Sequence, residues 1–252
     1  MSNIYKAFEN KKAFIAFLTA GDPDYETSVK NFKAVAEAGA DLIEIGIPFS
    51  DPIAEGPVIQ GADLRALESG MTTDKVFDLL KEIRKEYDTP VVFMTYANPV
   101  YHYGSEEFFK KASEAGADGI IIPDCPFEER HEFCDIAEKF GMDFISMIAP
   151  TSENRIKEIA SQAKGFIYVV SSMGVTGVRS EINTDLDSII KNIKDVTDVP
   201  AAIGFGISTP EQAEKMRAVA DGVIVGSAMV KIVAEEGENA PEKLFKYVKS
   251  MK

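Results

Sequence analysis

Residues 37–47 read EAGADLIEIGI, and residues 114–122 repeat the pattern as EAGADGIII. In both stretches a helical pattern ends at a glycine, Gly39 or Gly116, and glycine is the usual left-handed residue at the C-terminal end of a helix. An unbroken apolar run then follows. Parallel strands covered by helices on both faces have such runs. The repeat therefore predicts helices that alternate with parallel strands.

Eight apolar runs of this kind lie along the chain. They are Ala13–Leu18, Leu42–Ile47, Val91–Met94, Gly119–Ile122, Phe144–Ile148, Phe166–Val170, Ala201–Ile203 and Gly222–Val225. Helical patterns are expected at Thr27–Ala38, Thr73–Glu86, Glu106–Ala115, Glu128–Phe140, Glu153–Ala163, Leu186–Lys194, Pro210–Ala218 and Pro241–Met251. A repeat of strand then helix without a change of composition predicts an α/β protein whose residues 1–252 form a single (β/α)8 TIM barrel domain. An open, doubly wound sheet is the alternative.

Composition narrows the classes of function. The chain has 41 acidic and 27 basic residues, a formal net charge of −14, so neither nucleic acid nor an anionic membrane is an expected partner. Cys125 and Cys134 have neither redox nor zinc spacing, and the two histidines lie beside no acidic cluster with metal-ligand spacing. No signal-peptide core or membrane-length apolar run occurs. We expect a cytoplasmic protein with reduced thiols and no metal.

In a barrel of this type, ligands bind where strands end and helices begin. The seventh run ends in GFGIS, residues 204–208, and the eighth ends in GSA, residues 226–228, before a short helix expected at Ala228–Val233. Glycines allow close approach of the backbone, and helix N-termini bind anions. These two loops predict a phosphate site. The glycine-rich stretch Ser171–Ser180 predicts a lid, with an ordinary connection as the alternative.

The second run contains a carboxylate, Glu44, between two isoleucines. Burial disfavours the ionised form, so the pKa of Glu44 should be raised unless a cation pairs with it. No other predicted strand carries a base, which favours proton transfer over a structural ion pair. Tyr168 in the sixth run is either an ordinary core residue or faces the same space as Glu44. Asp51 and Glu55 follow in the next loop, where acids are usually solvated.

Seven segments together resemble the α-subunit family of tryptophan synthases. They are FLTAGDP (17–23), EIGIPFSDP (44–52), EGPVIQ (55–60), YANP (96–99), GVTG (174–177), GFGIS (204–208) and GSA (226–228). The resemblance covers nearly the whole chain. It implies a lyase of tryptophan biosynthesis that cleaves indole-3-glycerol phosphate to indole and glyceraldehyde 3-phosphate without a cofactor.

The resemblance also implies roles for single residues. Glu44 matches the acid–base glutamate, and Glu55 stands where the family usually has the aspartate that stabilises the charge on the indole N–H. The ring-contacting positions are Phe17, Tyr96 and Tyr168. Thr176 matches the threonine that closes the lid over the second carboxylate. The phosphate contacts are Gly177, Gly206, Gly226 and Ser227.

The family's α subunit docks on a β subunit that holds pyridoxal phosphate, in an α2β2 complex. Asp51 matches a residue on that interface. Three alternatives remain at this point. The chain is a free-standing lyase, a non-catalytic partner that activates a β subunit, or another phosphate-binding barrel enzyme.

Overall fold

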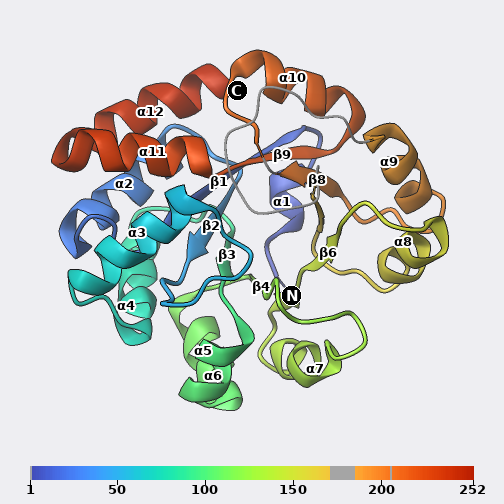
Figure 1. Ribbon diagram of the computed structural model, residues 1–252, viewed down its shortest axis with the longest axis horizontal. Coiled ribbons are helices and arrows are strands. Elements are labelled where there is room, and N and C mark those ends of the chain that lie inside the picture. Colours follow the sequence, from blue (N-terminus) through green and yellow to red (C-terminus); the bar gives the residue numbers. More distant parts are fainter. Residues whose placement is uncertain (1, 171–184, 205) are drawn as a thin grey trace.

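The computed structural model describes residues 2–170, 185–204 and 206–252. Nine strands pair in parallel in the order β5-β4-β3-β2-β1-β9-β8-β7-β6. Helices surround this central sheet (Figure 1). The strands are β1 Ala13–Thr19, β2 Leu42–Gly46, β3 Val91–Met94, β4 Gly119–Ile121, β5 Asp143–Phe144, β6 Ser146–Ile148, β7 Ile167–Val170, β8 Ala201–Gly204 and β9 Gly222–Val225.

One predicted strand, Phe144–Ile148, appears as two short strands. Together they join the two ends of the sheet. β5 pairs with β4 and β6 pairs with β7, so the two ends of the strand order are consecutive pieces of chain. Only Ile145 separates them, and its N–H donates to the carbonyl of Ile120 at 2.9 Å. The barrel prediction is confirmed, and the doubly wound alternative is wrong because a doubly wound sheet keeps two open edges.

Every predicted helix is present within a few residues. The helices are α1 Tyr5–Phe8, α2 Tyr25–Glu37, α3 Pro57–Glu68, α4 Thr73–Arg84, α5 Ala97–Tyr103, α6 Ser105–Ala115, α7 His131–Lys139, α8 Glu153–Ala160, α9 Leu186–Lys194, α10 Pro210–Val219, α11 Ser227–Glu236, the 3-10 turn η1 Gly237–Asn239, and α12 Ala240–Met251. Three helices, α1, α3 and α5, were not predicted from the sequence. Of these, α3 matters most, because it begins directly after the loop that carries Glu55.

The aspartates just before β2, β4 and β9 each bind a neighbouring strand. The N–H of Asp41 donates to the carbonyl of Phe14 at 2.9 Å, and its carboxylate accepts the N–H of Phe14 at 2.8 Å. The same two-way pairing joins Asp118 with Val91 and Asp221 with Ala201. Each aspartate thereby fixes the register of two strands at their N-terminal ends, the end of a barrel that serves stability.

Two further expectations concern membranes and disulfides. No helix in the described ranges is long and apolar enough to cross a membrane. Cys125 and Cys134 are free thiols, as expected.

Candidate active site

Glu44 lies inside the barrel, in the middle of β2. It is paired in register with Phe17 of β1, and its side chain is only 1% exposed. Tyr168 lies on β7, which is not adjacent to β2, and yet the charges of Glu44 and Glu55 raise its pKa together with burial. These three groups therefore lie close enough to interact electrostatically. This proximity favours the interpretation in which Tyr168 shares the space of Glu44, and its role in a site stays a prediction.

Burial, followed by the charge of Glu55, raises the pKa of Glu44 to about 8. Its Oε1 atom is fully buried and has no hydrogen-bond partner within the described part of the chain. A carboxyl group in this state carries its proton at neutral pH and is available to donate it. The predicted rise in pKa is confirmed.

Glu55 is not a solvated loop residue, because its side chain is only 5% exposed. Its N–H donates to the carbonyl of Pro52 at 3.2 Å, and the side-chain amide of Gln60 donates to its carbonyl at 2.8 Å. The preceding N–H, of Ala54, donates to the hydroxyl of Tyr96 at 3.1 Å. The backbone around Glu55 is therefore held in place, and the charge of its carboxylate reaches Glu44.

Asp51, in the same loop, is exposed and accepts a hydrogen bond from the hydroxyl of Ser50 at 2.5 Å. It borders a shallow cavity of about 450 Å³ whose apolar lining includes Ile53, which is 74% exposed, and Leu64. Exposed apolar side chains beside a charged loop are typical of a protein interaction surface. Asp51 and Glu55 thus have opposite environments, one on the surface and one inside.

Phe17 forms one wall of the site because two glycines make room for its ring. A Cβ atom on Gly46 would stand 2.7 Å from Cζ of Phe17, and one on Gly226 would stand 3.2 Å from its Cδ1. Tyr96 is buried on another side, with its ring 5.6 Å from that of Phe49. Burial and then the charge of Glu55 raise the pKa of Tyr96, so its phenol stays neutral. The structure brings all three predicted aromatic residues to this end of the barrel.

Two helices begin at the predicted phosphate loops, but their N-termini differ. In α10 the hydroxyl of Thr209 accepts the N–H of Gln212 at 3.3 Å, and the amide oxygen of Gln212 accepts the N–H groups of Ser208 and Thr209 at 2.8 and 3.2 Å. This capping box satisfies the first donors of α10 with the helix's own side chains.

By contrast, α11 begins at Ser227 after Gly226, and no side chain in the described ranges caps it. Its first N–H groups are directed out of the helix and can bind an anion. Gly206 lies in the neighbouring loop with φ of +86°, a conformation that favours glycine. Gly206, Gly226 and Ser227 therefore lie on the two loops that the sequence predicted, and the N-terminus of α11 is the better anion site of the two.

Thr176 and Gly177, and the whole proposed lid Ser171–Ser180, lie outside the described residues. Their roles stay predictions.

Asp63 of α3, which is 6% exposed, is a buried acid near the site that was not predicted from the sequence. Burial, then the charges of Glu55 and Asp22, raise its pKa to about 8. The nearby cation, Arg65, is engaged by Asp22 in a two-point ion pair of 2.7 and 2.9 Å. The signal for this residue was present in the sequence. The buried positions of α3 are the helical set i, i+3, i+4 and i+7, namely Ile59, Ala62, Asp63 and Ala66.

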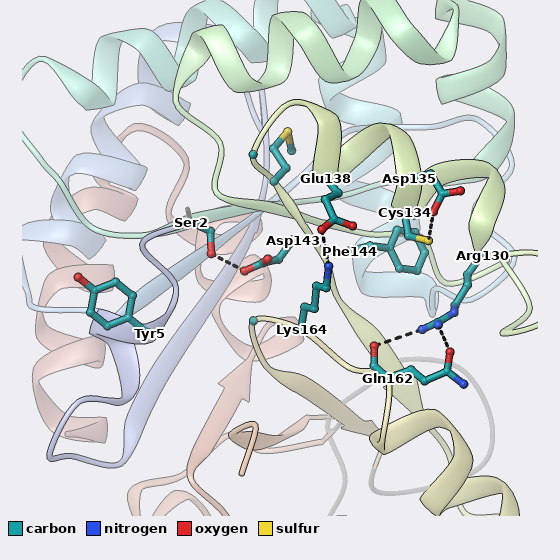
Figure 2. Close-up of a pocket in the computed structure, with 13 residues that line it drawn as sticks. Ser2, Tyr5, Arg130, Cys134, Asp135, Glu138, Asp143, Phe144, Gln162 and Lys164 are labelled. Atoms are coloured by element: carbon teal, nitrogen blue, oxygen red, sulfur yellow. Dashed lines mark hydrogen bonds and ion pairs between the residues drawn. The ribbon is translucent and has the colours of Figure 1, made fainter. Parts of the chain in front are cut away.

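A larger cavity, of about 850 Å³, lies at the other end of the barrel near the start of β5. Figure 2 shows that Lys164 and Glu138 point toward one another, while other polar side chains form separate pairs. Lys164 pairs with Glu138 at 2.8 Å, Arg130 bonds Gln162, and Ser2 bonds Asp143. None of the predicted site residues lines it. In the described ranges no group of three or more His, Cys, Asp or Glu side chains is placed to hold a metal ion.

Comparison with known proteins gives one consistent result. The family model described as tryptophan synthase alpha chain matches residues 5–252. The tryptophan synthase alpha chain of Lacticaseibacillus casei is 52% identical over 252 residues, which cover 100% of this chain and 95% of that one.

Two solved structures are also similar over almost their full length. A chain of the Pyrococcus furiosus tryptophan synthase α2β2 complex is 38% identical, with a TM-score of 0.87 and coverage of 96% and 98% of the two chains. A chain of Mycobacterium tuberculosis tryptophan synthase is 32% identical, with a TM-score of 0.90 and coverage of 99% and 96%. With its barrel, its buried acids and these similarities, the chain belongs to the tryptophan synthase alpha chain family.

Proposed function

We propose that this chain is a carbon–carbon lyase that cleaves indole-3-glycerol phosphate to indole and glyceraldehyde 3-phosphate, the reaction of its family. The observation that carries the proposal is the buried Glu44 carboxyl group inside the mouth of the barrel, with a pKa of about 8 and an oxygen that has no hydrogen-bond partner among the described residues. Such a group can both donate and accept a proton near neutral pH.

The reaction needs one proton given and one proton removed. Glu44 donates its proton to C3 of the indole ring, which makes the ring an electron sink. The resulting carboxylate takes the proton from the hydroxyl group on the carbon attached to C3. The carbon–carbon bond then breaks, its electrons return to the ring, and the hydroxyl becomes the aldehyde of glyceraldehyde 3-phosphate. Glu44 ends protonated, so no cofactor is required.

Glu55 is the second carboxylate of the mechanism. Protonation of C3 places positive charge on the indole nitrogen, and an ionised carboxylate that accepts its N–H stabilises that charge. The same negative charge helps to keep Glu44 protonated before the reaction.

The remaining contacts hold the two ends of the substrate. Phe17, Tyr96 and Tyr168 surround the indole ring. The phosphate binds at the N-terminus of α11, to backbone donors of Gly206, Gly226 and Ser227. Backbone donors suit a chain with a net charge of −14, since its surface attracts no anion. Thr176 and Gly177 are proposed to complete the site from the lid.

We also propose that the chain assembles with a β subunit in an α2β2 complex, with Asp51 on the interface. The exposed Ile53 beside Asp51 supports this placement. Pyridoxal phosphate belongs to the β subunit. Residues 1–252 are proposed to form one domain, located in the cytoplasm, which agrees with the continuous sheet and the two free thiols.

The test is to incubate the purified chain with indole-3-glycerol phosphate, alone and with a tryptophan synthase β subunit, and to measure indole release. Slow release that the β subunit accelerates supports the proposal. Fast release that the β subunit leaves unchanged indicates a free-standing lyase. No release under either condition, with the β subunit still activated, indicates a non-catalytic partner.

A further inference from the structure

Tyr247 lies on the C-terminal helix α12, a segment that carries none of the proposed site residues. Figure 1 shows α12 alongside α11 and close to α10, the two helices that follow the phosphate loops. The hydroxyl of Tyr247 donates a hydrogen bond of 2.8 Å to the backbone carbonyl of Ser208. One side chain of α12 therefore reaches the loop between β8 and α10.

The same residue of that loop is also held from its other side. The N–H and the hydroxyl of Ser208 donate to the side-chain oxygen of Gln212 at 2.8 and 3.2 Å. Both backbone groups of Ser208 are thus bound by side chains, one from α10 and one from α12. Gly206 stands only two residues earlier, in its left-handed conformation. The direction of the peptide groups after Gly206 is consequently set from outside the loop.

The hydroxyl of Tyr247 can donate a hydrogen bond throughout the working pH range. Its ring is half-buried and packs against the core, as a phenylalanine ring would in that place. Burial raises the pKa of Tyr247 to about 12, so the phenol keeps its proton throughout the working range. What tyrosine adds over phenylalanine at this position is the hydrogen bond to Ser208.

We propose that Tyr247 is a positioning residue for phosphate binding: by holding the carbonyl of Ser208 it anchors the end of this loop, and so keeps the backbone N–H of Gly206 in place for the substrate's phosphate. The inference rests on the proposed function, since that phosphate is the substrate's. Donors fixed before binding lose less conformational entropy when the ligand arrives, and so bind it more tightly.

The test compares Tyr247→Phe with the wild-type chain and with a matched control, Tyr103→Phe. The hydroxyl of Tyr103 bonds Asp74 and Lys111 and has no bond to the phosphate loops. Calorimetric titration with glycerol 3-phosphate should give a Kd about 3–10-fold higher for Tyr247→Phe, which corresponds to the net contribution of one hydrogen bond. Tyr103→Phe should bind like wild type. The Kd for indole, which has no phosphate, should be the same in all three proteins.

In cleavage assays Tyr247→Phe should raise KM for indole-3-glycerol phosphate by a similar factor and leave kcat nearly unchanged. An unchanged Kd for glycerol 3-phosphate would overturn the proposal, even with a lower unfolding temperature, because it would reduce Tyr247 to a structural role. An equal loss of indole affinity would overturn it as well. If the Kd difference is present but the wild-type chain releases no indole, the positioning role stands and the proposed reaction fails.

Discussion

The hydroxyl oxygen of Tyr168 lies 2.5 Å from the point where a Cβ atom on Gly204 would stand, and Cζ of the ring lies 2.7 Å from it. Carbon atoms do not approach so closely, so Gly204 on β8 is what allows the tyrosine of β7 to occupy its place in the site. The position of Tyr168, a proposed ring-contacting residue, thus depends on the absence of a side chain on the neighbouring strand.

Gly204→Ala should therefore displace the Tyr168 ring and lower kcat/KM for indole-3-glycerol phosphate by about 10–100-fold, the cost of a reacting geometry shifted by a fraction of an ångström. A double-mutant cycle checks the cause. In a Tyr168→Ala background, the Gly204→Ala change should cost little more. Fully additive losses would show that Gly204 acts on something other than Tyr168.

Glu44 should make the fold less stable at neutral and alkaline pH. The folded pKa of Glu44 is raised above the value of an unfolded glutamate, so its contribution to stability is fully present below pH 4 and is lost as pH rises through about 8. The variant Glu44→Gln carries an amide, which does not ionise as the pH rises. Urea unfolding should show the variant to be more stable than wild type at pH 8, on the order of 3 kcal/mol, and nearly equal at pH 4. Equal stability at pH 8 would contradict the burial of Glu44 and the raised pKa that follows from it.

Asp63 should add a second ionisation to the alkaline loss of activity. Its folded pKa is also about 8, and the groups that face it are Glu55 and Asp22, with Arg65 already engaged by Asp22. As pH rises, a new charge appears beside Glu55 while Glu44 loses its proton. In Asp63→Asn, only the ionisation of Glu44 should still lower the activity as pH rises. The slope of log kcat/KM against pH above 9 should change from about −2 to about −1.

At pH 7 this variant should keep activity within about threefold of wild type, because an amide resembles the neutral carboxyl group it replaces. A loss of more than about a hundredfold at pH 7 would show that Asp63 acts as a charged group.

The aspartates that pair with a neighbouring strand, Asp41, Asp118 and Asp221, should matter for stability and not for activity. Although burial opposes it, the bonds from Lys194 and from the N–H of Ala201 lower the pKa of Asp221. Its contribution is then present above pH 4 and is lost as pH falls through the depressed folded pKa. Asp221→Asn should lower the free energy of unfolding by about 1–2 kcal/mol at pH 7 and by less at pH 3. Asp78→Asn, which removes an exposed pair with Lys81, is the control and should cost almost nothing.

The sequence predicted the features that depend on residues close together in the chain, and not those that depend on distant residues. Strands and most helices were predictable because apolar runs and glycine joints are local signals. The start of α3 gave no clear signal, because Gly56 and Pro57 are common in loops, although proline is also common in the first turn of a helix. Glu44 was found because an acid inside an apolar run is a local contradiction. Tyr247 and Gly204 were not, because their roles appear only when distant segments of chain meet.

The central claim is that Glu44 supplies the proton that starts carbon–carbon cleavage, and Glu44→Gln tests it most directly. The variant keeps the shape of the side chain and removes its ability to transfer a proton. At pH 7, kcat/KM for indole-3-glycerol phosphate should fall by about 10²–10⁴-fold, while the Kd for glycerol 3-phosphate stays at the wild-type value. Activity within about tenfold of wild type would contradict the claim and move the acid–base role to another group.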